Sequence, residues 1–277
     1  MVAVTAEALV DAPCPRAGIT VEGLGVGDSL VSVWRTADGV REPVRGARRV
    51  TLVDAAFLTD YDAPLGRPVT YEVEVISGPD GASRTSSDAV VIESETAWLM
   101  DPLVPQSAIP IRTTRDADGA PYLRGEALAK LEYEANVSLI EVMGSSAPMG
   151  LFGQVMKARG VPFQMSTRSA SENKRLKGLL TSTAQLLYRQ PASYGIDLPG
   201  SMFISVQRKT ELPVDVGWGG SLTWWDMTAD SVKAPSLKVL TATFTYGDVA
   251  LMFGTYQQKQ DLMDGKTYLE DLKKPIG

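Results

Sequence analysis

The sequence predicts a mainly β protein with two domains. Short segments in which apolar and polar residues alternate recur along the chain, and such alternation is typical of half-buried strands. The 25 glycines and 17 prolines are scattered along the whole length, as a chain of many short strands and turns requires. A length of 277 residues suits two domains of ordinary size, and a content of 44% apolar residues is enough to pack two cores.

Residues 1–95 predict an immunoglobulin- or fibronectin-like β-sandwich. The clearest strand covers residues 70–76, a Gly-Pro-Asp-Gly turn follows it, and residues 89–92 supply the return strand. Repeated short strands and turns of this kind favour a sandwich, with Trp34 and Tyr71 as its core aromatics. In the clearest strand the apolar side chains Tyr71, Val73 and Val75 face one side, and Glu72 and Glu74 face the other.

Residues 96–112 predict a linker between the domains. Pro102, Pro105 and Pro110 fall within nine residues of one another and leave the backbone without those hydrogen-bond donors. We expect this segment to be extended, to lie outside any helix or central strand, and to be anchored by Trp98.

Residues 113–244 predict a second β domain that contains one helix. Apolar and polar residues alternate from 131 to 139, which indicates a half-buried strand. Ser169 and Glu172 have the spacing of a capping box at the start of a helix. The apolar face of that helix consists of Leu176, Leu179 and Leu180. Further strands are expected at residues 161–165, 184–188, 202–206, 222–225 and 237–244.

Residues 245–277 predict a helical C-terminal segment. Thr245 and Asp248 fit a second capping box, and apolar residues recur after it at helical spacing. Because an exposed apolar stripe is a docking or aggregation site, we expect this one to pack on its own domain or on a neighbouring copy. The stripe consists of Val249, Met252, Phe253, Tyr256 and Met263.

The composition argues against several classes of function. A net charge of −6 provides no global means of neutralising phosphates, so we expect no nucleic-acid binding. The chain has no histidine, which removes the common Ser-His-Asp and Cys-His nucleophiles and the usual zinc ligands. Its single cysteine, Cys14, allows no intrachain disulfide, and no apolar run reaches the ~20 residues of a membrane helix. We therefore expect no enzyme activity, cofactor, metal, membrane anchor or export signal.

Paired carboxylates are the remaining candidates for catalysis, since a glycosidase needs two of them in a cleft. Residues two apart on a strand share a face, but here that face lies opposite the apolar stripe. We interpret the pairs as solvated surface, and the arginines of residues 41–49 as a solvated edge or, alternatively, a contact for an acidic partner. The pairs are Asp60 with Asp62, Asp116 with Asp118, and Glu132 with Glu134.

The best candidate binding site is a group of three tryptophans, Trp218, Trp224 and Trp225. Exposed tryptophans on a β scaffold can stack on sugar rings, which gives a carbohydrate-binding module as the alternative function. Since Trp224 and Trp225 are adjacent, one of them must point inward on a strand. We interpret the group as core or subunit-interface packing, and we add Phe253 and Tyr256 to the predicted interface.

The order of several motifs resembles that of minor tail proteins from long-tailed phages of actinobacteria, over about residues 70–277. Residues 98–105 (WLMDPLVP) resemble the linker of that family, and residues 168–180 resemble the short helix of its barrel domain. The motifs that follow are Arg-x-Pro at 189–191, Tyr-Gly at 194–195, Thr-Tyr-Gly-Asp-Val at 245–249 and Thr-Tyr at 255–256.

This resemblance implies a distal tail protein, a structural component that joins the tail tube to the tail tip. It implies a split β-barrel for the second domain and no catalytic residues. The implied partners are other copies of the chain, in a ring of six or alternatively three, together with the tail tube protein and other tail-tip proteins. The implied location is the tail tip of the virion, after synthesis in the host cytoplasm.

Overall fold

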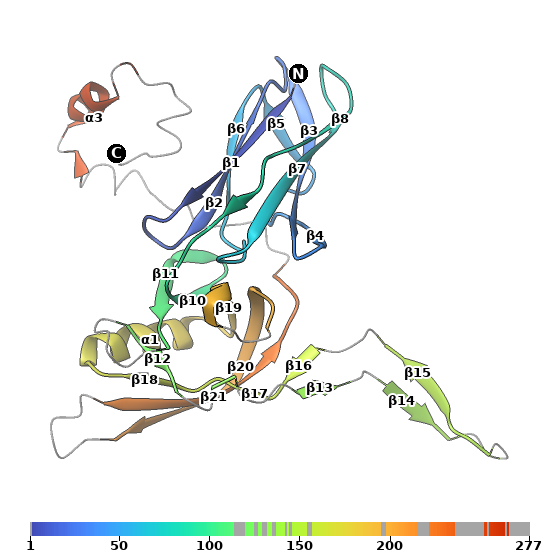
Figure 1. Cartoon of the computed structure of the whole chain (residues 1–277), viewed down its shortest axis with the longest axis vertical. Helices are drawn as coiled ribbons and strands as arrows, with labels where there is room; N and C mark the ends of the chain where they lie inside the picture. The colour runs from blue at the N-terminus through green and yellow to red at the C-terminus, as the bar shows by residue number, and fades with distance from the viewer. Residues whose placement is uncertain are drawn as a thin grey trace. The chain divides into compact units, whose positions relative to one another are not determined.

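The protein is mainly β, and one of its sheets curls into half of a barrel (Figure 1). The computed structural model describes residues 2–113, 120–124, 127–128, 132–134, 137–141, 143, 146–153, 157–194, 198–214, 222–235, 252–253, 255–263 and 265. The chain divides into two compact units. Unit 1 comprises Met1–Ala108, Arg189–Ser201 and Pro235–Gly277, and unit 2 comprises Ile109–Tyr188 and Met202–Ala234.

Unit 1 contains two antiparallel sheets whose buried side chains form one apolar core. The first sheet has the order β1 (Ala3–Leu9), β2 (Arg16–Glu22) and β6 (Ala56–Asp60). The second sheet is built on the pair of β3 (Asp28–Ala37) and β7 (Pro68–Ser77). Its shorter strands are β4 (Val40–Pro43) and β5 (Val50–Val53), which pair with β3, and β8 (Ser83–Ser86) and β9 (Val90–Val91), which pair with β7.

The alternation expected in β7 is confirmed, and its apolar residues Tyr71, Val73 and Val75 are buried. Trp34, in contrast, is not a core residue. On β3 the inward positions are occupied by Val31, Val33 and Arg35, so Trp34 lies on the outer face and is half-buried. Its indole N–H donates to Glu74 at 3.0 Å, and the guanidinium carbon of Arg41 lies 3.9 Å from the ring centroid.

The prediction that residues 96–112 form a linker outside any central strand is wrong. This segment forms β10 (Ala97–Asp101) and β11 (Val104–Ile111), and Leu99 and Met100 are fully buried. Pro102 lies in the turn between the strands, and β11, which holds the other two prolines, is the terminal strand of its sheet. Proline is tolerated on an edge strand because one side of the backbone there has no ladder partner.

In unit 2 the strands lie in the order β19 (Gln185–Arg189), β20 (Ser201–Pro213), β21 (Thr223–Ser231), β18 (Met165–Thr167) and β12 (Tyr122–Leu123). β17 (Val161–Pro162) also pairs with β21. The strands predicted near 161, 184, 202 and 222 are therefore present, although the first is broken into two and those near 202 and 222 run further than predicted. A short 3₁₀ helix, η1 (Ala192–Tyr194), follows β19.

The predicted helix is confirmed as α1 (Ala170–Ser182). Ser169 is its N-cap, and the Ser169 hydroxyl accepts the backbone N–H of Glu172 at 3.2 Å. The Glu172 carboxylate accepts the backbone N–H of Arg168 at 2.8 Å, so the turn before the helix is held as well. The predicted apolar face is buried and consists of Leu176, Leu179 and Leu180.

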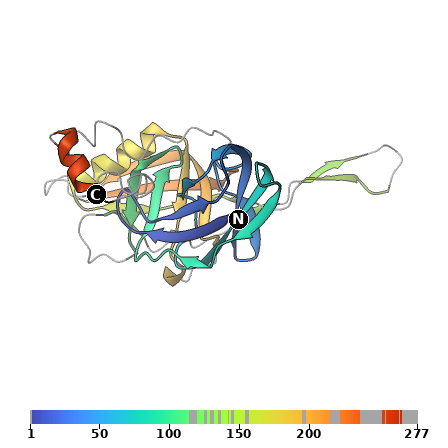
Figure 2. The ribbon, with the colours of Figure 1, turned by 90° about the horizontal axis from the view of Figure 1, so that it is seen from above.

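The half-buried strand predicted at 131–139 forms two short strands, β13 (Glu132–Glu134) and β14 (Val137–Ile140). β13 pairs with β16 (Lys157–Arg159), and β14 pairs with β15 (Met149–Phe152). Both views draw β14 and β15 as a narrow two-stranded ribbon (Figures 1 and 2). The prediction of half-burial is wrong for β14, because all four of its residues are exposed.

The described part of the C-terminal segment contains α3 (Tyr256–Leu262). Its capping box joins Thr255 and Gln258, which the sequence pattern did not single out. The strand predicted at 237–244 and the capping box predicted at Thr245 lie outside the described residues. Among the described helices, none is long and apolar enough to cross a membrane.

Candidate functional site

The adjacent tryptophans on β21 point to opposite sides, as predicted. Trp225 is 4% exposed, and its indole N–H donates to the Asn173 side chain on α1 at 2.8 Å. Trp224 is half-buried on the other face. Trp218 lies outside the described residues. Trp225 is therefore a core residue, and Trp224 is the member of the predicted group that remains available to a partner.

One face of the Trp224 ring is occupied by an arginine. The guanidinium carbon of Arg124 lies 4.2 Å from its centroid, and the same guanidinium pairs with Asp226 at 2.9 Å. A cation that is stacked on an indole and held by a carboxylate occupies the face that a sugar ring would need. This arrangement favours a packed surface over a carbohydrate-stacking platform.

The other two residues of the predicted interface belong to unit 1. Phe253 is half-buried, and Tyr256 is the first residue of α3, with a side chain outside the described set. The tryptophans belong to unit 2, so the predicted interface is divided between the two units.

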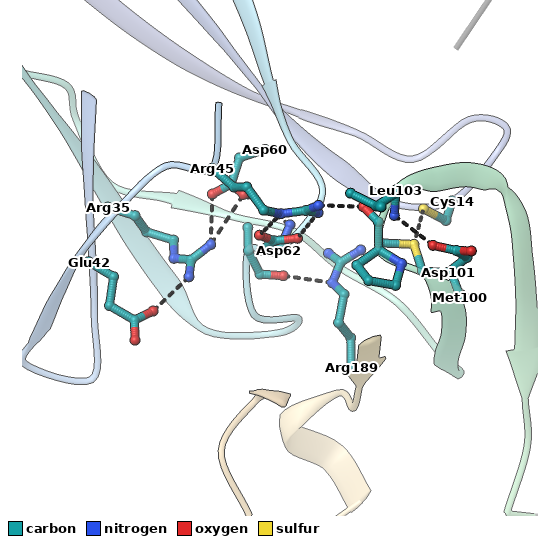
Figure 3. Close-up of polar contacts among 12 residues, drawn as sticks. Cys14, Arg35, Glu42, Arg45, Asp60, Asp62, Met100, Asp101, Leu103 and Arg189 are labelled. Atoms are coloured by element: carbon teal, nitrogen blue, oxygen red, sulfur yellow. Dashed lines mark hydrogen bonds and ion pairs between the residues drawn. The ribbon is translucent and has the colours of Figure 1, made fainter. Parts of the chain in front are cut away.

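Unit 1 holds a buried cluster of charges (Figure 3). It includes three residues predicted as solvated, Asp60, Asp62 and Arg45, and the side chain of Arg45 is 11% exposed. Asp60 and Asp62, predicted as solvated surface, are 2% and 4% exposed. Arg35 donates from Nη1 to both carboxylate oxygens of Asp60, at 3.2 and 2.9 Å. Arg45 donates two hydrogen bonds to the Asp62 carboxylate, from Nε at 2.8 Å and from Nη2 at 2.6 Å. The guanidinium groups compensate the carboxylates and explain how these can be buried.

The network continues from both carboxylates. The Asp60 carboxylate accepts the hydroxyl of Tyr71 at 3.1 Å and the backbone N–H of Asp62 at 2.9 Å. Burial, and next the negative charge of Asp60, raise the pKa of Tyr71 far above its usual range. Arg35 also reaches Glu42 at the rim, and Arg45 donates to the carbonyl of Pro102. The cluster thus ties β3, β6, β7 and the turn after β10 together.

Arg189, at the end of β19, is fully buried beside this cluster. Its Nε donates to the carbonyl of Ala63 at 2.8 Å, and its Nη1 donates to the carbonyl of Pro15 at 2.6 Å. Burial lowers the pKa of Arg189 from its ordinary value. The side chain therefore serves as a donor that satisfies two backbone carbonyls.

Cys14 lies at the edge of the same cluster and does not have the properties of a nucleophile. Its thiol is 1% exposed and contacts the Met100 sulfur at 3.9 Å. Burial raises the pKa of Cys14, although the guanidinium groups of Arg189 and Arg16 act in the opposite direction. A neutral, inaccessible thiol is a small apolar core group.

The cluster is better suited to holding the unit together than to catalysis. A general acid or base must reach substrate, but both carboxylates are buried, Asp60 among guanidinium, hydroxyl and backbone donors and Asp62 against the guanidinium of Arg45. The described residues contain no group of three side chains that could bind a metal ion. The pairs Asp116 with Asp118 and Glu132 with Glu134 have side chains outside the described set.

The most unusual surface is the hairpin of β14 and β15, hereafter the apolar hairpin (residues 137–152). Cross-strand pairs place Val137 with Phe152 on one face and Ile140 with Met149 on the other. Apolar side chains therefore occupy both faces, and Leu139 and Phe152 are 67% and 80% exposed. The exposed apolar residues of this hairpin are Val137, Leu139, Ile140, Met143, Met149, Leu151 and Phe152.

Gly150 contributes to the shape of the apolar hairpin. A Cβ atom at Gly150 would lie 2.8 Å from the ring of Phe152, so the ring lies over this glycine.

The sequence already indicated that both faces of this hairpin are apolar. From Val137 onward apolar residues occupy both odd and even positions, as in Leu139-Ile140 and Leu151-Phe152, so neither face of a strand could be polar.

No family model matches the chain, and no curated protein or solved structure matches it.

Proposed function

We propose that the chain is a structural minor tail protein of a long-tailed phage, located in the distal tail and joining the tail tube to the tip complex. The observation that carries this proposal is the apolar hairpin. Seven apolar side chains on both of its faces and near its tip are exposed. Exposed apolar patches of this kind mark interaction sites, so the chain is suited to work as one part of an assembly.

The architecture supports the same proposal. The two sheets of unit 1, packed around one core, suit an immunoglobulin- or fibronectin-like sandwich. The curled half-barrel sheet, and the position of α1 between β18 and β19 in the chain, suit the split β-barrel that the resemblance implies. The order of the tail-protein motifs along the chain is an independent argument, because it was drawn from the sequence.

The proposed partners are further copies of the chain, the tail tube protein and other tail-tip proteins. A head-to-tail interface forms a ring when its rotation closes. We expect a ring of six copies, with three as the alternative. The buried cluster around Asp60 and Asp62 agrees with a structural role, because its carboxylates form ion pairs with arginines of the same unit.

Immunogold electron microscopy of the parent virion tests the proposal. An antibody against the chain should label the tail tip at the end distal to the capsid. Label on the capsid, or particles without label, would overturn it. A control antibody against the tail tube protein should label the length of the tail.

A carbohydrate-binding module is the weaker alternative. Trp225 is buried and Trp224 carries Arg124 on its ring, so the described tryptophans offer little open surface for a sugar. Titration with host-wall polysaccharide should give no binding in the ~millimolar range, which corresponds to ~4 kcal/mol. Binding that disappears in Trp224→Ala would favour the alternative.

A further inference from the structure

The apolar hairpin has two open edges as well as two apolar faces. Among the described residues, β14 and β15 form a sheet of their own and pair with each other alone. An isolated two-stranded hairpin is marginally stable in water, and three or more strands or a packed face are normally needed. Within the described part of the chain, the hairpin therefore has neither a cover for its faces nor partners for its outer backbone groups.

Both strands are short, four residues each, but neither carries a side chain that would keep its edge from pairing. Natural edge strands carry lysine, proline or inward-pointing charge, which block pairing with another chain. The sequences Val-Ser-Leu-Ile in β14 and Met-Gly-Leu-Phe in β15 contain neither charge nor proline. This edge is open to strand addition.

We propose that β14 of one copy pairs with β15 of a second copy, so that the apolar hairpins form a continuous antiparallel sheet that joins neighbouring copies head to tail. This inference rests on the proposed assembly function and names its interface. Within one hairpin β14 and β15 run antiparallel, so adding the β14 of a neighbour beside β15 continues the alternation of strand direction.

Charge favours a second copy as the occupant. The chain has a net charge of −6, so identical copies repel one another in general. The uncharged strands are a part of the surface where copies meet without that penalty. The backbone groups along an uncharged strand edge can pair with a strand edge of a second copy of the chain. No oppositely charged partner is needed for this pairing.

The size of the hairpin favours the head-to-tail arrangement. A stable interface usually involves about 20–30 residues a side, and residues 137–152 fall short of that. In a two-fold contact each copy would use one edge once. In a head-to-tail arrangement each copy uses both edges, β14 toward one neighbour and β15 toward the other, so the assembly is held on two sides of every copy.

A lipid surface fits the hairpin less well. Inside the hydrocarbon region each unpaired backbone group costs several kcal/mol, and sheets cross or enter it as closed barrels. Both outer edges of β14 and β15 would be unpaired there. A protein strand satisfies these groups, and a bilayer does not.

The first test measures the association of the full chain by sedimentation equilibrium. Leu139→Lys places a charge on an exposed hairpin position, and Val40→Lys is the matched control, since Val40 is 58% exposed on β4. The wild type and Val40→Lys should oligomerise alike, whereas Leu139→Lys should associate at least ~10-fold more weakly. An oligomer unaffected by Leu139→Lys, or a wild type that stays monomeric, overturns the inference.

The second test locates the contact by disulfide cross-linking. Ser138 and Leu151 are cross-strand neighbours within one hairpin, and Cys14 is buried, so an introduced cysteine is the reactive thiol. Ser138→Cys and Leu151→Cys variants of different tag length are mixed and oxidised. Mixed cross-links should dominate. Links between two Ser138→Cys copies alone would indicate a two-fold contact, and an oligomer without links would place the interface elsewhere; both refute the inference.

Further measurements separate a failure of the hairpin inference from a failure of the proposed function. Flotation with neutral phosphatidylcholine vesicles should show no binding, and binding lost in Leu139→Lys would assign the hairpin to lipid instead. If immunogold labels the tail tip but mixed links are absent, the hairpin inference alone falls. If mixed links form but the tail tip is unlabelled, the contact stands and the tail function falls.

Discussion

At the scale of single residues, the buried Asp60 is held by donors from three other residues of unit 1. Its carboxylate is bound by the guanidinium of Arg35, the hydroxyl of Tyr71 and the backbone N–H of Asp62. Hydrogen bonds to charged groups contribute about 1.5–3 kcal/mol each, and a buried charge that loses its partner costs more. Changes at this residue or its partners should therefore affect stability.

Tyr71→Phe should lower the free energy of unfolding by about 1.5–3 kcal/mol near neutral pH, because Asp60 loses one donor. It should also change the pH dependence. Burial and Asp60 raise the pKa of Tyr71, so the unfolded chain loses this proton near pH ~10 while the folded chain keeps it. Wild-type stability is therefore intact below pH ~10 and falls above it.

Urea unfolding at about pH 7 and about pH 10.5 tests this prediction. Lysines and the other tyrosines titrate in both proteins. The difference between the two proteins in the stability lost from about pH 7 to about pH 10.5 therefore isolates Tyr71. The loss of stability between these pH values should be smaller in Tyr71→Phe than in the wild type. Equal losses would contradict the assignment.

Cys14 should resist thiol reagents in the folded protein. Its thiol is buried, and burial raises its pKa, so the reactive thiolate is scarce and shielded. Labelling with a maleimide, followed by mass spectrometry, should proceed at the rate of unfolding and become fast in urea. The Val40→Cys variant is the positive control, with one fast label in native buffer, because Val40 is 58% exposed and lies outside the apolar hairpin. Native labelling of Cys14 at the rate of a free thiol would disprove its burial.

At the scale of elements, local patterns predicted local structure. The capping box at Ser169 and the alternation around Tyr71 were readable because their partners lie within a few residues. Strand β11 was missed because its prolines are tolerated at a sheet edge, and its edge position is a property of the whole sheet. Strand β10 has no proline and was missed because it adjoins this proline-rich segment. Asp60 and Asp62 were misplaced because their guanidinium partners, Arg35 and Arg45, are 25 and 17 residues away in the chain, respectively.

Ser169→Ala should lower the stability of the protein by about 0.5–2 kcal/mol, the usual effect of removing an N-cap. The side chain of Ser169 accepts the N–H of Glu172, and alanine would leave that donor to water. Lys174→Ala is the control, because Lys174 lies exposed on α1 away from the cap. Thermal or urea unfolding should show a clear loss for Ser169→Ala and a smaller change for Lys174→Ala. Equal effects would mean that the cap does not stabilise α1.

At the scale of the whole molecule, unit 1 is discontinuous in sequence. Residues 189–201 belong to it although they follow about eighty residues that belong to unit 2. Arg189 is the deepest contact of this segment, and it donates to the carbonyls of Pro15 and Ala63. No local sequence pattern indicates that residues of unit 2 are inserted between segments of unit 1. For this reason the sequence suggested two successive domains. The fold of unit 1 is therefore expected to depend on residues beyond the N-terminal part of the chain.

Arg189→Leu in the full chain should weaken unit 1, because two buried carbonyls lose their donors. Leaving a buried polar group unsatisfied costs about 1–3 kcal/mol, so the two together should cost at least ~2 kcal/mol. Cys14 is a local reporter, since it lies beside Arg189 (Figure 3). Its labelling rate should rise at least ~10-fold in Arg189→Leu and remain at the wild-type value in Arg208→Leu, a change at an exposed arginine of β20. A fragment of residues 1–112 should label faster than the full chain for the same reason. Unchanged protection of Cys14 in Arg189→Leu would show that unit 1 closes its core without this segment.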